Sequence, residues 1–243
     1  MNLSIDAKIA GSLYGLLVGD AFGCPVEGWS PEKIQKEYGT LREMKASRGR
    51  FRPAGLHSDD GQQAMALCEA ILANPERPAP LFAEILVRMY QRGESIPRTT
   101  FGLHRGTGRN FRATVEALAA GASWDRAAQP SAGLGNAMLI APLAWYWRED
   151  GKTLCRQVVE IGRVKQNDIR GIAGAGAVAG LVACALAQRS WKAFQAEELL
   201  GFVRGVEDLA ASLLGRTDHL RTFSQALAAM LRERGGDRRD VLA

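Results

Sequence analysis

Apolar residues recur along most of the chain with the three- and four-residue spacing of amphipathic helices. In the first such segment Ile9, Leu13 and Leu17 fall on one side of a helix. Long alternating runs of Val, Ile and Thr are missing, so few strands are expected. Helices are predicted over about 6–22, 60–73, 79–92, 110–121, 134–148, 153–162, 169–188, 192–203, 205–215 and 218–233. The pattern therefore predicts an all-α protein, a compact helical bundle.

The first predicted helix carries Gly11, Gly15 and Gly19 four residues apart, and such a ridge without side chains lets a second helix approach closely. Residues 24–57 are rich in Pro, Gly and Arg and predict a long irregular connection, which in a compact domain is usually functional or disordered. No repeat of fixed period and no linker-like change in composition divides the sequence. We therefore expect a single domain over residues 1–243.

The charge of the chain argues against a nucleic-acid partner. The formal net charge is +5, with 31 basic residues interspersed among 26 acidic ones. Because nucleic-acid binding usually needs a clustered basic stripe, we expect none. A positive field nevertheless favours an anionic small substrate.

Cysteine usage and hydropathy predict a cytoplasmic protein. The four cysteines form no C-x-x-C pair and lie among small apolar residues, as in reduced proteins. The N-terminus lacks the basic and apolar regions of a signal peptide. The apolar stretch 171–188 is too rich in Gly and Ala for a convincing membrane span. We expect no membrane partner and a monomer.

The first stretch with candidate chemistry follows the first predicted helix and reads Gly19-Asp-Ala-Phe-Gly23-Cys-Pro25-Val-Glu27. Gly23 and Pro25 end the helix, so Glu27 emerges on the connection beyond it. Taken alone, the stretch is explained equally well as a helix stop followed by a solvated acid.

The second stretch is the triplet Ser58-Asp59-Asp60, which opens a predicted helix. Two adjacent carboxylates beside a hydroxyl are hard oxygen ligands of the kind that Mg²⁺, Mn²⁺ or Ca²⁺ prefers. The alternative is structural: Ser58 is a natural N-cap, and the two aspartates would face the positive end of the helix. The triplet alone favours the cap.

Two glycine-containing loops each precede a predicted helix: His104-Arg-Gly-Thr-Gly-Arg-Asn110 and Pro130-Ser-Ala-Gly-Leu-Gly-Asn-Ala-Met138. Backbone N–H groups at a helix N-terminus can cradle a phosphate. Arg105 and Arg109 could add charge-assisted hydrogen bonds to it. Taken singly, each loop is more simply explained as an ordinary helix connection.

In this order the stretches resemble the ADP-ribosylglycohydrolase family, over about residues 7–188. The shared motifs are G-D-x-x-G-x-P-x-E, a hydroxyl-Asp-Asp triplet, R-G-x-G at Arg105–Gly108, and S-x-G-x-G-x-A-M-x-I-A-P at Ser131–Pro142. The resemblance implies a compact all-α fold, two divalent metal ions (Mg²⁺ or Mn²⁺), and hydrolysis of the bond between ADP-ribose and a protein side chain or small acceptor. The implied partner is an ADP-ribosylated protein or a small ADP-ribose conjugate.

The resemblance also implies roles for individual residues. Metal ligation is implied for Glu27, Ser58, Asp59 and Asp60, and catalysis for Glu27, Asp59 and Asp60, with Glu27 a candidate to polarise water. Contact with the diphosphate is implied for Gly106, Thr107 and Gly108, and with the ribose and diphosphate side for Ser131, Gly133 and Gly135.

The sequence departs from the family pattern near its C-terminus. Family members carry G-G-D-T-D-T before a last helix, and here the chain reads Gly235-Gly-Asp237-Arg-Arg239-Asp240 and stops three residues later. Asp237 is expected to be a metal ligand, whereas Arg239 replaces the second aspartate and would repel a cation. The domain is accordingly expected to lack the usual last helix, with its metal motif degenerate or truncated.

Three further positions depart from the pattern. Gly61 stands where threonine is usual, Leu134 where asparagine is, and Lys165-Gln166 where a Thr-His pair is common. Three functions therefore stay open: an active ADP-ribosyl hydrolase, a weakly active or inactive relative that binds ADP-ribose or a nucleotide as a regulatory module, and a helical interaction protein without a ligand. The acidic triplet and the glycine-rich loops favour the first two.

Overall fold

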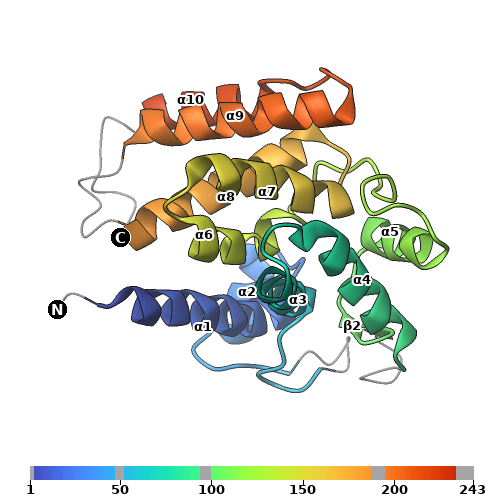
Figure 1. Ribbon diagram of the computed structural model, residues 1–243. Helices are drawn as coiled ribbons and strands as arrows, with labels where there is room; N and C mark the ends of the chain where they lie inside the picture. The colour runs from blue at the N-terminus through green and yellow to red at the C-terminus, as the bar shows by residue number, and fades with distance from the viewer. Residues whose placement is uncertain (1–2, 47–51, 94–99, 188–194, 234–243) are drawn as a thin grey trace. The chain divides into compact units, whose positions relative to one another are not determined.

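The computed structural model describes residues 3–46, 52–93, 100–187 and 195–233. Their contacts divide into an N-terminal unit, Leu3–Ala122, and a C-terminal unit that begins at Ser123. Both units are built mainly of helices, so the predicted all-α class is confirmed (Figure 1). The single domain predicted over residues 1–243 stays a prediction.

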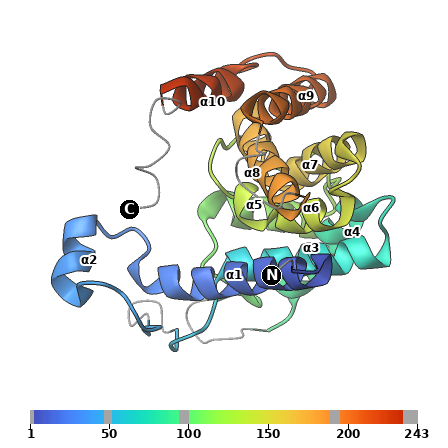
Figure 2. The same cartoon turned by 90° about the vertical axis from the view of Figure 1, so that its left-hand side faces the viewer.

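The N-terminal unit contains five α-helices, a short 3-10 helix and one hairpin among the described residues. They are α1 (Ile5–Gly23), η1 (Cys24–Val26), α2 (Pro31–Tyr38), α3 (Asp59–Ala73), α4 (Pro78–Gln91), β1 (Thr100–Phe101), β2 (His104–Arg105) and α5 (Arg109–Ala119). Helix α1 packs on α3, α3 on α4, and α4 on α5. Figure 2 shows α2 projecting beyond the C-terminal end of α1.

The core of this unit lies between α3 and α4. Leu67 and Ile71 come from α3, Phe82 and Leu86 from α4, and none of these side chains is more than 2% exposed. Each pair is spaced four residues apart and so lies on one face of its helix. Burying a side chain of this size stabilises the fold by about 1.5–3 kcal/mol. This packing fixes the start of α3, where the acidic triplet lies.

Two details of the N-terminal unit correct the sequence predictions. The segment 24–57 is not irregular throughout, because α2 forms within it: the Ser30 hydroxyl accepts a hydrogen bond from the Lys33 amide at 3.3 Å, and Pro31 suits the first turn. The hairpin was not expected; its two strands pair antiparallel through only two residues each, too few for an alternating pattern.

The glycine ridge of α1 does not pack as predicted. A Cβ added at Gly11, Gly15 or Gly19 would meet no described atom within 4 Å. Within the described N-terminal unit, therefore, no helix enters the ridge.

The C-terminal unit contains five α-helices and a 3-10 helix among its described residues. They are η3 (Ala137–Leu139), α6 (Ala141–Trp147), α7 (Gly151–Lys165), α8 (Ile169–Ala187), α9 (Ala196–Leu214) and α10 (Thr222–Glu233). Helix α8 is central, because α6, α7, α9 and α10 all contact it. Figure 2 shows α9 and α10 side by side over one end of this unit.

Small residues let α8 and α9 approach closely. A Cβ added at Gly180 would lie 2.8 Å from Leu199 Cδ1, and one at Gly176 would lie 3.0 Å from Val206 Cγ2. Both distances are too short for an ordinary contact. The Gly- and Ala-rich composition of this helix therefore serves helix packing.

Three predicted helix boundaries in this unit were wrong. The ranges 192–203 and 205–215 form one helix, α9, because burial of Val203 and Val206 on either side of Gly205 outweighs the glycine cost of about 1 kcal/mol. The α-helix predicted at 134–148 starts only at residue 141, with Pro142 in its first turn. Helix α10 starts at 222 because His219 and Arg221 have positive φ angles.

Two helices are long and apolar enough to cross a membrane by length and composition alone, Ile5–Val26 and α8. For α8, 56% of the apolar window is buried inside the protein, as in a core helix, against 17% for the first. Core helices and N-terminal signal sequences pass the same test, so the expectation of no membrane partner stays a prediction.

Candidate functional site

The C-terminal end of α1 is tied to the start of α3 by Asp20. Its carboxylate accepts hydrogen bonds from the Ser58 hydroxyl at 2.7 Å, the Ser58 amide at 2.9 Å and the Gly61 amide at 2.9 Å. Ser58 occupies the N-cap position of α3, but its side chain makes no capping bond. The predicted capping role of the Ser58 hydroxyl is therefore wrong, because Asp20 satisfies the helix amides instead.

The two aspartates of the triplet form the first turn of α3 and are half-buried. Asp59 is held in place by Gln63, one turn later, whose amide donates to Asp59 Oδ2 at 3.2 Å. Both carboxylates lie at the positive end of the helix, which stabilises their charged form. The triplet is thus a preorganised set of hard oxygen atoms.

A buried guanidinium lies beside this set. Arg52 is 3% exposed, and its Nη1 donates to the Cys24 thiol of η1. A Cβ added at Gly106 would collide with Arg52 Nη2 and lie 3.1 Å from Asp59 Oδ1, so both groups face the Gly106 backbone. Gly106 has φ +76°, which also favours glycine. Arg52 therefore lies where the first motif, the triplet and the R-G-x-G loop come close together, near Cys24, Asp59 and Gly106.

His57 fills the space beside Gly61. A Cβ at Gly61 would lie 2.7 Å from both His57 Nδ1 and Leu17 Cδ2. The Arg105 guanidinium lies 3.3 Å from the His57 ring nitrogens. Burial lowers the pKa of Arg105 from its ordinary value and the charge of Arg52 lowers it further, whereas Asp20 raises it. In this chain, the histidine ring takes the volume that a threonine at position 61 would need.

The R-G-x-G loop runs from β2 into α5. Gln62 of α3 anchors it, accepting from the Arg105 amide at 2.8 Å and donating to the Leu103 carbonyl at 2.9 Å. The Thr107 hydroxyl accepts from Arg112 Nε at 2.9 Å, and Gly108 is the N-cap of α5 without a side-chain cap. Gly108 therefore offers no side-chain cap to the first turn of α5, and phosphate binding at this turn stays a prediction.

In the C-terminal unit, the predicted substrate loop lies before η3. Ser131 and Gly135 are half-buried, and Gly133 is exposed. The Ser131 hydroxyl accepts weakly from the Gly133 amide at 3.4 Å. The next residue, Asn136, is fully buried and donates from Nδ2 to the Gly162 carbonyl of α7 at 3.0 Å. The loop is therefore anchored to α7.

The two remaining predicted ligands are Glu27 and Asp237. Glu27 ends η1 and is exposed. Asp237 lies outside the described residues. In the described part of the chain, no group of three or more His, Cys, Asp or Glu side chains gathers in a way that could hold a metal ion.

The oxygen donors of the triplet fit Mg²⁺ or Mn²⁺ in kind. The Ser58 hydroxyl donates its hydrogen bond to Asp20, so the lone pairs of the serine oxygen can face a cation. Asp59 and Asp60 add carboxylates of the type that these ions prefer. The donor chemistry of the triplet therefore suits a hard cation, and the binding of one or two such ions stays a prediction.

The sequence pattern that describes the ADP-ribosylglycohydrolase family matches residues 1–241. The chain belongs to this family. The resemblance carried by the four motifs is thereby confirmed, and membership supports a glycohydrolase-type function.

Two other proteins and one solved structure are similar to this chain. An uncharacterized protein of Archaeoglobus fulgidus is 31% identical over 207 residues, covering 85% of the chain and 65% of that protein. The ADP-ribosylarginine hydrolase Tri1 of Serratia proteamaculans is 33% identical over 150 residues, covering 60% of the chain and 38% of Tri1. A solved ADP-ribosylglycohydrolase-related protein complex contains a chain with a TM-score of 0.60 and 25% identity, covering 82% of this chain and 62% of that one. The chain thus spans less than two thirds of each relative's length.

Sequence reasoning missed several residues that organise these groups. Asp20 belongs to the motif G-D-x-x-G-x-P-x-E, but we assigned it no role. Its place just before the helix stop at Gly23 and Pro25 was the signal that could have identified it. Gln62 and Gln63 are amides one turn inside α3, in a stretch that looks like ordinary helix. Arg52 gave no signal, because a single arginine in a Pro- and Gly-rich segment has no pattern.

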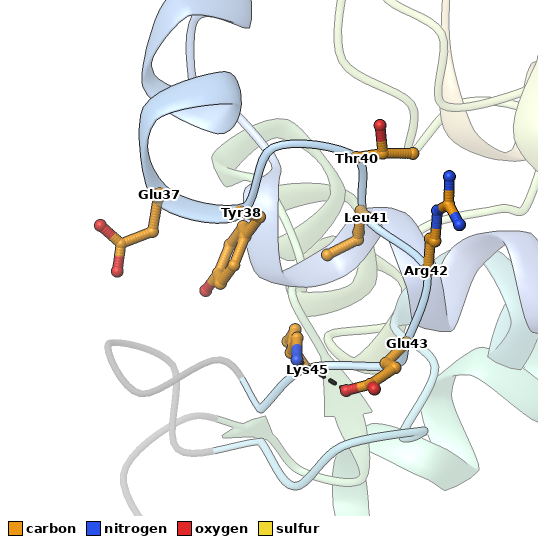
Figure 3. Close-up of a pocket in the computed structure, with 7 residues that line it drawn as sticks. All are labelled: Glu37, Tyr38, Thr40, Leu41, Arg42, Glu43 and Lys45. Carbon is orange, nitrogen blue, oxygen red and sulfur yellow. Dashed lines mark hydrogen bonds and ion pairs between the residues drawn. The ribbon is translucent and has the colours of Figure 1, made fainter.

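A pocket of about 290 Å³ is lined by none of the predicted site residues. It is formed by the end of α2 and the segment that follows, with Tyr38 and Leu41 on its wall and Lys45 bonded to Glu43 at 2.8 Å (Figure 3). Acidic and basic side chains both line it. This mixture indicates no particular class of ligand.

Proposed function

We propose that the chain is an ADP-ribosyl hydrolase that works with a divalent cation, Mg²⁺ or Mn²⁺. Family membership supports the reaction class, and the observation that carries the proposal is the ordered triplet at the start of α3, with Ser58 oriented by Asp20 and Asp59 held by Gln63. Capping by Asp20 uses the Ser58 and Gly61 amides, and it needs neither the bond from the Ser58 hydroxyl nor the Gln63 amide on Asp59. Hard oxygen atoms fixed in this way suit a cation.

Ser58, Asp59 and Asp60 would hold the cation, with Glu27 and Asp237 as further ligands in the proposal. When bound, such an ion supplies Lewis-acid stabilisation of charge that develops on oxygen and lowers the pKa of a bound water. The protein's own contribution is positional. Asp20 keeps the Ser58 proton away from the site. Glu27 would take one proton from the attacking water, and that proton would pass to the acceptor as its bond to the anomeric carbon breaks. Departure of the acceptor at the anomeric carbon builds positive charge, which nearby carboxylates stabilise.

The substrate proposed is an ADP-ribose conjugate, bound through its diphosphate by backbone amides. In the N-terminal unit Gly106, Thr107 and Gly108 lead into the open first turn of α5. In the C-terminal unit Ser131, Gly133 and Gly135 form the second loop. The formal net charge of +5 favours the approach of such an anion. Because all four cysteines are free, we place the protein in a reducing cytoplasm.

A second candidate function is binding of ADP-ribose without turnover. The observation that favours it is Arg52, whose buried guanidinium faces the Gly106 backbone together with Asp59 and would repel a cation bound there. Arg239 in the C-terminal motif would likewise repel a cation. A protein of this kind would serve as a regulatory module.

Hydrolysis assays separate the two functions. The full chain is incubated with ADP-ribosylated arginine and serine peptides, with millimolar Mg²⁺ or Mn²⁺ or with EDTA, and free ADP-ribose is measured. The arginine peptide comes first, because Tri1 is named for that linkage. Release that depends on the metal supports the hydrolase. Tight ADP-ribose binding without release from either peptide supports the binding module.

A further inference from the structure

The end of α7 carries two residues that belong to no shared motif, Lys165 and Gln166. Both are buried, at 4% and 5% exposure, although their side chains are polar and one is charged. Burial of an amide or ammonium group costs free energy unless hydrogen bonds compensate it. Their partners therefore show what they do.

Gln166 holds both ends of the loop Ser131–Asn136. Its Nε2 donates to the Gly133 carbonyl at 2.9 Å, the Ser131 carbonyl at 3.2 Å and the Ser131 hydroxyl at 3.3 Å. Its Oε1 accepts from the Asn136 amide at 3.0 Å. The Gln166 side chain thus donates to the first half of the loop and accepts from its last residue.

The neighbouring backbone is shaped to let Gln166 reach the loop. A Cβ added at Gly171 of α8 would lie 3.0 Å from the Ser131 carbonyl and 3.3 Å from Gln166 Oε1. Asn167, next in the chain, donates its amide to the Gln129 carbonyl at 3.1 Å, just before the loop. The segment that carries Gln166 is therefore paired with the segment that leads into the loop.

Lys165 completes the arrangement by donating from Nζ to the Gly135 carbonyl. The carbonyls of Ser131, Gly133 and Gly135 thus all accept hydrogen bonds from this pair. A peptide carbonyl and the following amide point in opposite directions, so the amides of Ala132 and Leu134 face away from Lys165 and Gln166. Both of these residues are exposed.

We infer that Lys165 and Gln166 are positioning residues, which set the conformation of the Ser131–Asn136 loop for an anionic, diphosphate-bearing ligand. This inference rests on the proposed function for the identity of the ligand. It assigns a role to a residue pair that replaces the Thr-His pair common in the family. The ammonium of Lys165 adds positive charge beneath a loop whose amides face the ligand.

The test compares Gln166→Leu, which removes all four hydrogen bonds, with Gln166→Glu, which keeps an acceptor for the Asn136 amide and loses the donor. Gln157→Leu is the matched control, because Gln157 is a fully buried glutamine of the same helix whose side-chain atoms have no hydrogen-bond partner among the described residues. Hydrogen exchange of the peptide that contains 131–136 reports the loop, and calorimetric titration with ADP-ribose reports binding.

Both Gln166 variants are expected to exchange the loop amides about tenfold faster or more, and to bind ADP-ribose about tenfold more weakly. The control should match the natural chain in both measurements. A purely structural role would lower the melting temperature without changing ADP-ribose affinity in the folded state, and that result overturns the inference. Unchanged loop exchange overturns it as well.

Failure of the natural chain to bind ADP-ribose contradicts the proposed function, and the exchange data then still decide whether Gln166 positions the loop.

Discussion

Asp20 and Ser58 are joined by two hydrogen bonds, from the serine hydroxyl at 2.7 Å and from its amide at 2.9 Å. The Asp20 carboxylate, in the last turn of α1, therefore does the capping that the serine at the start of α3 would otherwise do for its own helix. The serine hydroxyl is thereby turned into an oriented oxygen. In the sequence, Asp20 looks like part of a helix stop and Ser58 like a helix start. In the structure the two residues are bonded to each other.

Replacing Asp20 by alanine should destabilise the N-terminal unit. The Ser58 and Gly61 groups that donate to it would lose a charged acceptor in a largely buried place, which costs about 2–3 kcal/mol. Urea unfolding followed by circular dichroism measures the change. Asp6→Ala is the control, because that aspartate is exposed in the first turn of α1 and should change stability by about 1 kcal/mol at most.

Replacing both aspartates of the triplet, Asp59→Asn with Asp60→Asn, should abolish Mn²⁺ binding while leaving the helix content almost unchanged. Amides are weaker ligands than carboxylates for hard cations, and they preserve the side-chain volume. Calorimetric titration with Mn²⁺ gives the affinity and circular dichroism the helix content. An unchanged Mn²⁺ affinity in the double variant would refute the ligand assignment.

Glu27→Gln should separate chemistry from binding. If Glu27 acts on the attacking water, ADP-ribose affinity stays within about tenfold of the natural chain while turnover falls. Titration with ADP-ribose and release of ADP-ribose from a modified peptide are measured on the same preparation. Equal turnover in the two proteins would remove Glu27 from the mechanism.

Gly61→Thr should destabilise the fold even though threonine is the usual family residue. The new side chain would overlap the His57 ring and Leu17, and overpacking of this kind costs about 1–3 kcal/mol. Shortening the histidine in the double variant His57→Ala/Gly61→Thr should recover part of the loss, because the two sites share one volume. If the losses in the free energy of unfolding from the two single variants simply add up in the double variant, the two side chains do not share one volume.

A matched glycine gives the control. Gly15→Ala lies in the interior of α1, where an added Cβ meets no described atom within 4 Å. Alanine is favoured over glycine in a helix by about 1 kcal/mol, so this variant should be neutral or more stable.

Much of the fold follows from the sequence, because the helices of both units carry clear apolar periodicity. Helix α9 was split in the prediction, since Gly205 reads as a break while the buried valines that carry the helix through it depend on tertiary contacts. Helix α2 and the hairpin were missed because short elements hold too few residues for a period.

The candidate site was predictable as a set of motifs and less so as a set of contacts. The triplet and the two loops stand out by composition. Asp20 and Gln166 act on them from 30 or more residues away, as in the Asp20–Ser58 pair with its separation of 38, and Arg52 reaches Cys24 across 28 residues. No local pattern records a partner at that distance. Sequence reasoning therefore names the groups that carry the chemistry and misses those that hold them.

Thermal unfolding of the full chain with and without ADP-ribose, each with and without millimolar Mg²⁺, tests the central proposal most directly. A ligand present at a hundred times its Kd stabilises the folded state by about 2.7 kcal/mol, which shifts the melting temperature by several degrees. We predict a shift with ADP-ribose that grows when Mg²⁺ is present. A shift that is the same without Mg²⁺ would favour the binding module, and no shift under any condition would contradict the proposed function.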